Sequence, residues 1–340
     1  MKATRSLVVA PNWVGDNVMA IPVLDALAAS ERSLTVLARP HLVPLLDLLA
    51  SVDEVVPRPK KDTDTIATLK SCHFEECIVL PNSFRSAWLP FRAGIPVRWG
   101  YRGDFRSALL EPAVRRPAGM RHQTTDYDSL LERMGVAIPA GLPAIALGPE
   151  ELAAGEETLR QAGIDSGGSA RIVGLFPGAE FGPSKRWPPE SFAELASRLA
   201  STPGVRVLVI AGPGEEALAA AVRGDGAPEI PILGPELDLA ELASVLATLD
   251  VLVTNDSGPM HIADAMGTHC VALFGPTNPA RTAPRGEGSR LLYTERWCSP
   301  CFRKRCPLFH QRCLRDLSAA QVHETVNVIL EAYPAPDSIS

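Results

Sequence analysis

The chain has 340 residues, of which 46% are hydrophobic and 21% charged, a length and composition that fit two globular domains and exclude a disordered protein. The net charge of −6 argues against a general nucleic-acid binder, and no apolar run reaches the roughly 18 residues of a membrane span. The first apolar stretch is interrupted by Asn12, Gly15 and Asp16, which indicates a β-strand and not a secretory signal. We therefore expect a cytoplasmic protein.

Short apolar runs alternate with amphipathic stretches along the chain. Continuous apolar strands separated by helices are typical of parallel sheets buried on both faces, so we expect an α/β fold. The expected strands cover residues 7–10, 34–37, 77–80, 172–176, 205–210, 250–253 and 270–274. The expected helices cover residues 17–29, 42–50, 125–134, 150–162, 189–200, 239–248, 259–266 and 318–332.

The alternation starts again after Asp165, and residues 166–169 have the Gly/Ser composition of a linker. We therefore expect one α/β domain over residues 1–165, a second over residues 170–316, and a C-terminal helix and tail over residues 317–340 that can pack on either domain. Ligands of open α/β sheets bind beyond the carboxyl ends of the strands. The polar motifs of this sequence follow expected strands, where that rule locates a binding site.

A first motif, PNWVGDN, joins the first strand to the first helix at residues 11–17. Gly15 allows close approach of a ligand, and Asp16 lies near a helix N-terminus, where the dipole favours an ionised carboxylate. Asp16 is therefore a candidate general base. The alternative is that Asp16 only caps the helix, a position that aspartate also favours.

A second motif, FPGAEFGPSKRWP, follows the first strand of the second domain at residues 176–188. Small residues, Gly178 among them, let the backbone approach a ligand, and Lys185 supplies positive charge before a helix. This combination suits a pyrophosphate, although the spacing of a Walker A loop is absent. The alternative is a solvated loop in which Pro188 and Pro189 begin a helix.

A third motif, NDSGPMH, lies between a strand and a helix at residues 255–261. Asp256 or Ser257 can cap the helix, and Gly258 leaves its N-terminal N–H groups accessible to a phosphate. Asp256 itself suits sugar hydroxyls better than phosphate, because like charges repel. His261 lies one helical turn after Ser257, although alone it would be interpreted as a core histidine.

Two further features concern charged residues. A carboxylate after a strand can hold a ribose hydroxyl pair, so Glu215 is a candidate, with a capped helix start as the alternative. Eight arginines but only two acids lie between Arg85 and Arg121, which indicates a local anionic partner.

Four cysteines lie close together near the C-terminus. Their thiolates could hold zinc or an iron–sulfur cluster in a structural site, although the spacing matches no standard zinc-finger or ferredoxin pattern. The alternative is a set of free thiols on a loop-rich segment that also contains His310. These residues are Cys298, Cys301, Cys306 and Cys313.

The order of the motifs resembles that of the ADP-heptose:lipopolysaccharide heptosyltransferases, glycosyltransferase family 9. The matching strings are WVGDN, FPGAEFGPSKRWP, NDSGPMHIADAMG and ALFGPTNP, and the motifs that contain them extend over residues 11–279. The first two are most similar to the heptosyltransferase II form. The resemblance implies a GT-B fold, in which two Rossmann-like domains with parallel sheets face a central cleft, the N-terminal domain binding the acceptor and the C-terminal domain ADP-heptose.

The resemblance also implies roles for the residues. Asp16 matches the family's catalytic aspartate, Lys185 its phosphate-binding lysine and Glu215 its ribose-binding glutamate. The family's Asp-[Ser/Thr]-Gly-x-x-His segment matches Asp256, Ser257, Gly258 and His261. These residues form the expected donor site, to which the second motif adds Gly178.

The implied reaction is an inverting transfer of heptose onto heptosyl-Kdo2-lipid A. It needs no cofactor, and the lipid-anchored acceptor implies peripheral contact with the cytoplasmic face of the inner membrane. Heptosyltransferase I, or another family 9 enzyme with a different acceptor, is one alternative. A non-catalytic nucleotide-sugar-binding protein of the same fold is another, against which Asp16 argues because a binding protein does not need a base.

Overall fold

The computed structural model describes residues 3–138, 140–165, 170–224 and 230–334. The chain divides into two compact units, Met1–Ala144 and Ile145–Ser340. Within the described residues, each unit contains one six-stranded sheet whose strands pair in parallel. The α/β fold with parallel sheets that the sequence predicts is therefore confirmed. The expected linker at residues 166–169 lies outside the described residues.

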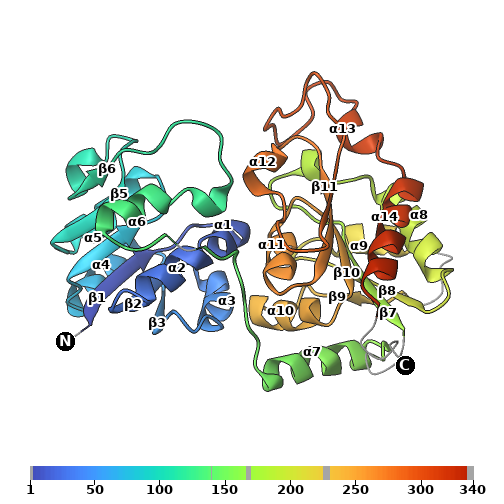
Figure 1. Ribbon diagram of the computed structural model, residues 1–340, viewed down its shortest axis with the longest axis horizontal. Coiled ribbons are helices and arrows are strands. Elements are labelled where there is room, and N and C mark those ends of the chain that lie inside the picture. Colours follow the sequence, from blue (N-terminus) through green and yellow to red (C-terminus); the bar gives the residue numbers. More distant parts are fainter. Residues whose placement is uncertain (1–2, 139, 166–169, 225–229, 335–340) are drawn as a thin grey trace. The chain divides into compact units, whose positions relative to one another are not determined.

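The first unit has the strand order β3-β2-β1-β4-β5-β6 (Figure 1). Its strands are β1 (Thr4–Val9), β2 (Arg32–Ala38), β3 (Glu54–Pro57), β4 (Glu76–Val79), β5 (Val97–Tyr101) and β6 (Ala113–Val114). Its helices are α1 (Val14–Met19), α2 (Ile21–Ala28), α3 (Val43–Asp47), α4 (Asp62–Ser71), α5 (Phe84–Arg92) and α6 (Asp128–Met134), with short 3-10 turns η1 (Pro40–Leu42), η2 (Ser107–Leu109) and η3 (Gln123–Thr125).

The first sheet is buried on both faces, as its continuous apolar strands predict. Leu7 and Cys77 belong to the hydrophobic cluster on one face, together with Leu69 of α4. Val8 and Ile78 pair with each other on neighbouring strands and are also fully buried. Because successive side chains of a strand point to opposite faces, these two residues lie on the other face of the sheet.

The second unit has the strand order β12-β11-β10-β7-β8-β9. Its strands are β7 (Arg171–Phe176), β8 (Val205–Ile210), β9 (Ile232–Leu233), β10 (Val251–Asn255), β11 (His269–Phe274) and β12 (Arg290–Tyr293). Its helices are α7 (Pro149–Gln161), α8 (Pro189–Ala200), α9 (Glu216–Arg223), α10 (Leu239–Ala247), α11 (Gly258–Ala265), α12 (Pro279–Thr282), α13 (Arg312–Arg315) and α14 (Ala319–Ala332), with the 3-10 turn η4 (Pro183–Lys185).

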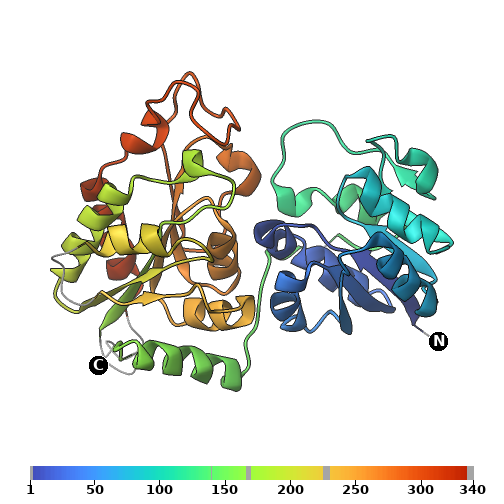
Figure 2. The ribbon, with the colours of Figure 1, turned by 180° about the vertical axis from the view of Figure 1, so that it is seen from behind.

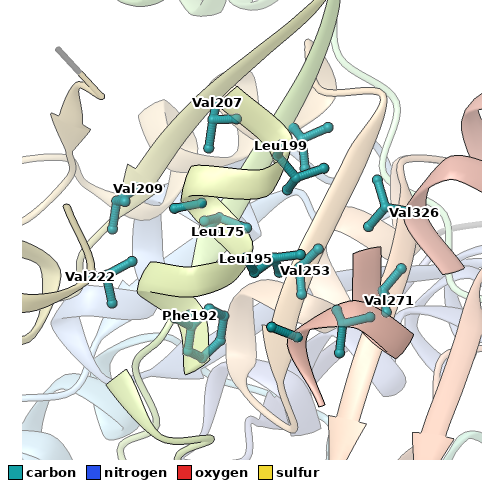
Figure 3. Packing of buried hydrophobic residues seen from close by; sticks show 14 of the residues in the cluster. Leu175, Phe192, Leu195, Leu199, Val207, Val209, Val222, Val253, Val271 and Val326 are labelled. Carbon is teal, nitrogen blue, oxygen red and sulfur yellow. The ribbon is translucent and has the colours of Figure 1, made fainter. Parts of the chain in front are cut away.

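The core of the second unit lies between its sheet and the helices α8, α9 and α14. Leu195 and Leu199 of α8 pack with strand residues such as Leu175 and Val253, and Val326 of α14 joins the same cluster (Figure 3). The final helix therefore packs on the second sheet. Among the described residues, no helix is both long and apolar enough to cross a membrane.

Helix α7, which the expected boundary at residue 165 assigns to the first domain, packs along α10 in the second unit (Figures 1 and 2). The two helices approach closely at Gly155, where a Cβ atom would lie only 2.2 Å from the carbonyl oxygen of Ser244. A glycine inside a helix is normally unfavourable, and this contact explains its presence. The chain thus passes from one compact unit to the other before α7 begins.

The two sheets share one topology. Taken in chain order, both follow the arrangement 3-2-1-4-5-6 that is typical of dinucleotide-binding sheets. The strand order reverses between β1 and β4 in the first unit, and between β7 and β10 in the second. Ligands of such sheets bind beside this reversal, at the carboxyl ends of the strands. The loops after these four strands are therefore where each unit can form a site.

Candidate functional site

Lys185 and Asp256 form a largely buried ion pair beside the strand reversal of the second unit. Lys185 lies in the loop after β7 and Asp256 directly follows β10, and the Lys185 Nζ atom is 2.6 Å from Asp256 Oδ2. The side chains are only 15% and 6% exposed. The hydroxyl of Thr277 donates a 2.6 Å hydrogen bond to the same carboxylate oxygen, and the ring of Phe181 lies 5.2 Å from the Lys185 ammonium group. Asp256, which the sequence assigned to sugar hydroxyls, thus has Lys185 and Thr277 as its partners.

Gly178 and Glu215 meet although 36 residues separate their loops in sequence. The Glu215 carboxylate accepts hydrogen bonds from the backbone N–H groups of Ala179 (3.1 Å) and Gly212 (3.2 Å), and it pairs with Arg186 at 3.1 Å. A Cβ atom at Gly178 would lie 1.8 Å from Glu215 Oε2, so a side chain here would displace the carboxylate. Glu215 occupies the N-cap position of α9, yet its side chain does not cap that helix. It stabilises the loop after β7 instead.

Asn255, the last residue of β10, connects both ends of the loop that carries Lys185. Its side-chain amide donates to the carbonyl groups of Pro177 (2.8 Å) and Gly178 (3.2 Å), and its Oδ1 atom accepts from the backbone N–H of Trp187 (2.9 Å). Asn255 is completely buried. No role was predicted for this residue from the sequence, although it stands first in the NDSGPMH motif.

Ser257 occupies the N-cap position of α11, but its side chain makes no capping hydrogen bond. Its hydroxyl instead lies 3.0 Å from that of Thr254. The helix then begins with Gly258 and Pro259, so the first turn has no bulky polar side chain over its N-terminus. His261 is buried in this helix. This N-terminus combines a positive helix dipole with uncapped geometry, which suits a phosphate group.

Asp16 lies in the third position of α1, and the N-cap position belongs to Trp13. The alternative that Asp16 is the helix N-cap is therefore wrong. Its Oδ1 atom accepts a 2.8 Å hydrogen bond from the side-chain amide of Gln123. Burial raises the pKa of the neighbouring Tyr127 phenol, and the negative charge of Asp16 raises it further. The loop before α1 is fixed by Asn17, whose amide donates to the carbonyl groups of residues 11 and 13.

Gln123 is a candidate site residue that the sequence analysis missed. It lies in η3, separated from Asp16 by 107 residues, and no local pattern marks it. Only the folded chain brings the amide to the carboxylate. The hydrogen bond orients the Asp16 carboxylate.

Several arginines between residues 85 and 121 serve the fold of the first unit. Arg98 donates to the Leu109 carbonyl and Arg102 to the Ala113 carbonyl. Arg106 is completely buried and donates hydrogen bonds to the backbone carbonyls of Tyr101 and Pro81. This burial lowers the pKa of its guanidinium group. Two more, Arg85 and Arg116, form ion pairs with Asp62 and Asp126. The sequence-based interpretation of this whole cluster as a surface for an anionic partner is therefore too broad.

The four cysteines of residues 298–313 and His310 line one pocket, which Ser184 also lines. Among the described residues, however, no group of three or more histidine, cysteine or acidic side chains could hold a metal ion. All four thiols are free. Burial, together with the neighbouring cysteines, raises the pKa of Cys313 to about 11. The zinc or iron–sulfur site that the sequence suggested does not fit this arrangement.

Comparison with known proteins gives consistent matches over most of the chain. The model of glycosyltransferase family 9 (heptosyltransferase) matches residues 63–311. The chain is 31% identical over 342 residues to lipopolysaccharide heptosyltransferase 2 of Escherichia coli K12, covering 96% of this chain and 98% of that protein. It is 33% identical over 304 residues to lipopolysaccharide heptosyltransferase 2 of Salmonella typhimurium, covering 85% of this chain and 87% of that protein.

A solved structure agrees with the sequence comparisons. The structure of E. coli ADP-heptose LPS heptosyltransferase II aligns with a TM-score of 0.83 at 29% sequence identity, covering 98% of this chain and 100% of that one. The GT-B class expected from the sequence, with two Rossmann-like units of parallel strands, is thereby confirmed.

Proposed function

Since the chain belongs to glycosyltransferase family 9, the family of the lipopolysaccharide heptosyltransferases, we propose that it transfers L-glycero-D-manno-heptose from ADP-heptose to the heptosyl-Kdo2-lipid A inner core. This is the reaction of a heptosyltransferase II, which takes an acceptor that already bears one heptose. The 31% and 33% identities to heptosyltransferase 2 proteins support this choice of acceptor. Both extend over more than four fifths of the chain.

The observation that carries the donor half of the proposal is the position of Lys185. Its ammonium group lies beside the β7–β10 reversal and contacts Asp256, which directly precedes Ser257 at the N-cap of α11. We propose that Lys185 and the α11 N-terminus bind the pyrophosphate of ADP-heptose. Gly178, in the same loop, leaves room for the Glu215 carboxylate.

We assign the other contacts to ADP-heptose to four further residues. Glu215 binds the ribose through carboxylate lone pairs beyond those used by its backbone donors. Gly258 keeps the start of α11 accessible, and His261 and Asp256 complete the site for the phosphate and the sugar. When the phosphate binds, it replaces the Asp256 carboxylate beside the Lys185 ammonium group, and the ion pair between the two residues breaks.

The proposed chemistry is a single displacement with inversion. The acceptor hydroxyl attacks the anomeric carbon of the heptose while the bond from that carbon to the phosphate oxygen of ADP breaks. The hydroxyl proton passes to Asp16, whose orientation Gln123 maintains, and the bonding electron pair leaves with ADP. Lys185 and the helix dipole stabilise the charge that develops on the leaving phosphate, in a transition state with oxocarbenium character. This route requires no resident cofactor.

The acceptor half of the proposal belongs to the first unit. Arg92 and Arg115 are exposed, and guanidinium groups match the phosphates and carboxylates of an inner-core acceptor. Because that acceptor is anchored by lipid A, the enzyme works at the cytoplasmic face of the inner membrane, where anionic lipid also attracts basic side chains.

The experiment that tests the proposal offers ADP-heptose with either of two acceptors, Kdo2-lipid A or heptosyl-Kdo2-lipid A. We expect ADP release and heptose transfer only with the acceptor that bears a heptose. Transfer only to Kdo2-lipid A would instead identify a heptosyltransferase I. Absence of ADP release with both acceptors would contradict the proposed reaction.

A further inference from the structure

The segment of residues 298–313, here called the cysteine segment, contacts the loop that carries Lys185. The backbone N–H of Ser184 donates to the Lys304 carbonyl at 3.2 Å, and the Ser184 hydroxyl donates to the Arg303 carbonyl at 2.5 Å. At Gly182, where φ is +144°, a Cβ atom would lie 2.8 Å from the Lys304 carbonyl oxygen. The two segments therefore pack backbone against backbone, directly beside Lys185.

Gln311, near the end of the cysteine segment, makes the most extensive of these contacts. Its side-chain Nε2 atom donates to the carbonyl groups of Pro183 (3.0 Å), Ser184 (3.2 Å) and Arg186 (2.8 Å). These three carbonyls stand on both sides of Lys185 in the sequence. One amide group thus fixes the backbone immediately before and immediately after the lysine.

The position of the Gln311 amide is itself well determined. Its backbone is left-handed, with φ 46° and ψ 31°, a conformation that residues other than glycine adopt only where the surrounding structure maintains it. The Gln311 carbonyl accepts hydrogen bonds of 3.0 Å from the N–H groups of Leu314 and Arg315 in α13. Leu314 is completely buried in the core of the second unit. The backbone of Gln311 is therefore held in place, and its side-chain amide extends toward the loop that carries Lys185.

We propose that Gln311 is a positioning residue for the donor: its amide holds the carbonyls on either side of Lys185 and so orients the ammonium group toward the pyrophosphate. This inference rests on the proposed function. Without the amide, the loop of residues 182–186 samples more conformations, and donor binding has to order it. Ordering a flexible segment lowers affinity even when every contact to the ligand is preserved.

The chemistry of the three partners makes a sharp test possible. All three are carbonyl oxygens, which only accept hydrogen bonds, so the amide NH2 is the group they require. The substitution Gln311→Glu keeps nearly the same size but replaces the donor with carboxylate oxygens that face three acceptors. It therefore has a larger effect than Gln311→Ala, which only removes the donor. Exposed Gln321 on α14 supplies the matched control, Gln321→Glu, with the same change of charge.

The experiment measures the Kd for ADP by calorimetry, together with the KM values for ADP-heptose and acceptor and the melting temperature. The net loss of a hydrogen bond corresponds to about a fivefold change in an equilibrium constant, so we expect Gln311→Ala to raise the Kd for ADP at least ~5-fold and Gln311→Glu to raise it further. The KM for ADP-heptose rises in parallel. The KM for acceptor stays within about twofold of wild type, because acceptor binding does not depend on this loop. The Kd and KM values of the control variant Gln321→Glu also stay within about twofold, because Gln321 does not contact the loop.

A double-mutant cycle separates positioning from a general structural effect. If Gln311 acts through Lys185, then Gln311→Ala in a Lys185→Ala background changes the Kd for ADP by less than about twofold. An independent variant, Ser184→Ala, removes the hydrogen bond to Arg303 and weakens ADP binding in the same direction by a smaller factor. It provides the test if a Gln311 variant does not fold.

Three results would overturn the inference. One is wild-type affinity for ADP in a folded Gln311→Glu variant, and another is full additivity with Lys185→Ala. The third is wild-type affinity in Ser184→Ala when neither Gln311 variant folds. A wild-type enzyme that neither binds ADP nor releases it from ADP-heptose would contradict the proposed donor itself, which distinguishes that failure from a failure of the Gln311 assignment.

Discussion

The substitution Asp16→Asn separates catalysis from folding at this site. Asparagine keeps the size of the side chain and an Oδ1 oxygen that can accept the hydrogen bond from Gln123, but it cannot take up a proton. Because Asp16 is the third residue of α1 and not its cap, the substitution removes no capping contact. The backbone contacts of Asn17 that fix the preceding loop are also unaffected.

The stability cost follows from these contacts. Loss of the carboxylate at the first turn of α1 removes about 0.3–1 kcal/mol of dipole interaction, and the bond from Gln123 loses its charge assistance, worth about 1 kcal/mol. The sum is about 1–2 kcal/mol at most, because Asp16 is partly exposed to solvent. For a chain of this size, that corresponds to a decrease in melting temperature of only about 2–6 °C.

The expected catalytic cost is far larger. General-base contributions are about 10²–10⁴-fold in rate, so we expect Asp16→Asn to lose at least about 100-fold in turnover at saturating donor and acceptor. The affinity for ADP should remain close to wild type. Turnover, ADP affinity and a thermal melt are measured on the same preparation, with Asp25→Asn, an exposed aspartate on α2, as the control. If Asp16→Asn retains more than about a third of wild-type turnover, Asp16 is not the base.

Three further predictions concern the second unit. Lys185→Ala should raise the Kd for ADP about 10- to 100-fold, because a charge-assisted contact is worth about 1.5–3 kcal/mol; unchanged calorimetric affinity would contradict this. Gly178→Ala should lower the melting temperature, since its Cβ would lie 1.8 Å from Glu215 Oε2 and displace that carboxylate from its backbone donors; a wild-type melt would refute the reasoning. Protein purified without oxygen should contain less than about 0.1 equivalent of zinc or iron, and elemental analysis that finds a full equivalent would restore a metal site at the four cysteines.

The sequence predicts the centre of each sheet better than its edges. The strands expected from continuous apolar runs are found as β1, β2, β4, β7, β8, β10 and β11. Strands β3, β5, β6 and β12 were missed because most of their residues are partly or fully exposed, so they lack a continuous apolar run. Strand β9 was missed because it has only two residues. Helix α5 was missed because Pro90 lies inside it and two arginines, Arg85 and Arg92, interrupt its apolar pattern.

The sequence also indicates which loops form the candidate site, but it does not reveal the long-range hydrogen bonds that hold the side chains and backbone of the site in position. The motifs around Lys185 and Asp256 were recognisable because their residue types cluster within a few positions. The contacts of Gln123 and Gln311 join segments more than a hundred residues apart, and glutamine carries no characteristic spacing of its own. Arg106 shows the converse, since an arginine that suggests an anionic ligand in the sequence bonds to the chain's own carbonyls in the fold.

The ion pair between Lys185 and Asp256 has a consequence for turnover. A buried ammonium group with no protein partner would retain a pyrophosphate strongly, because departure of the ligand would leave an uncompensated charge. Here the Asp256 carboxylate lies 2.6 Å from the Lys185 ammonium group and is hydrogen-bonded to Thr277, so it can pair with Lys185 again when the ligand leaves. In the proposed reaction the departing ADP is replaced by Asp256, so the exchange of one anion for another lowers the barrier to product release. If Lys185 binds the donor as proposed, the carboxylate that competes with the donor for Lys185 also favours the release of ADP.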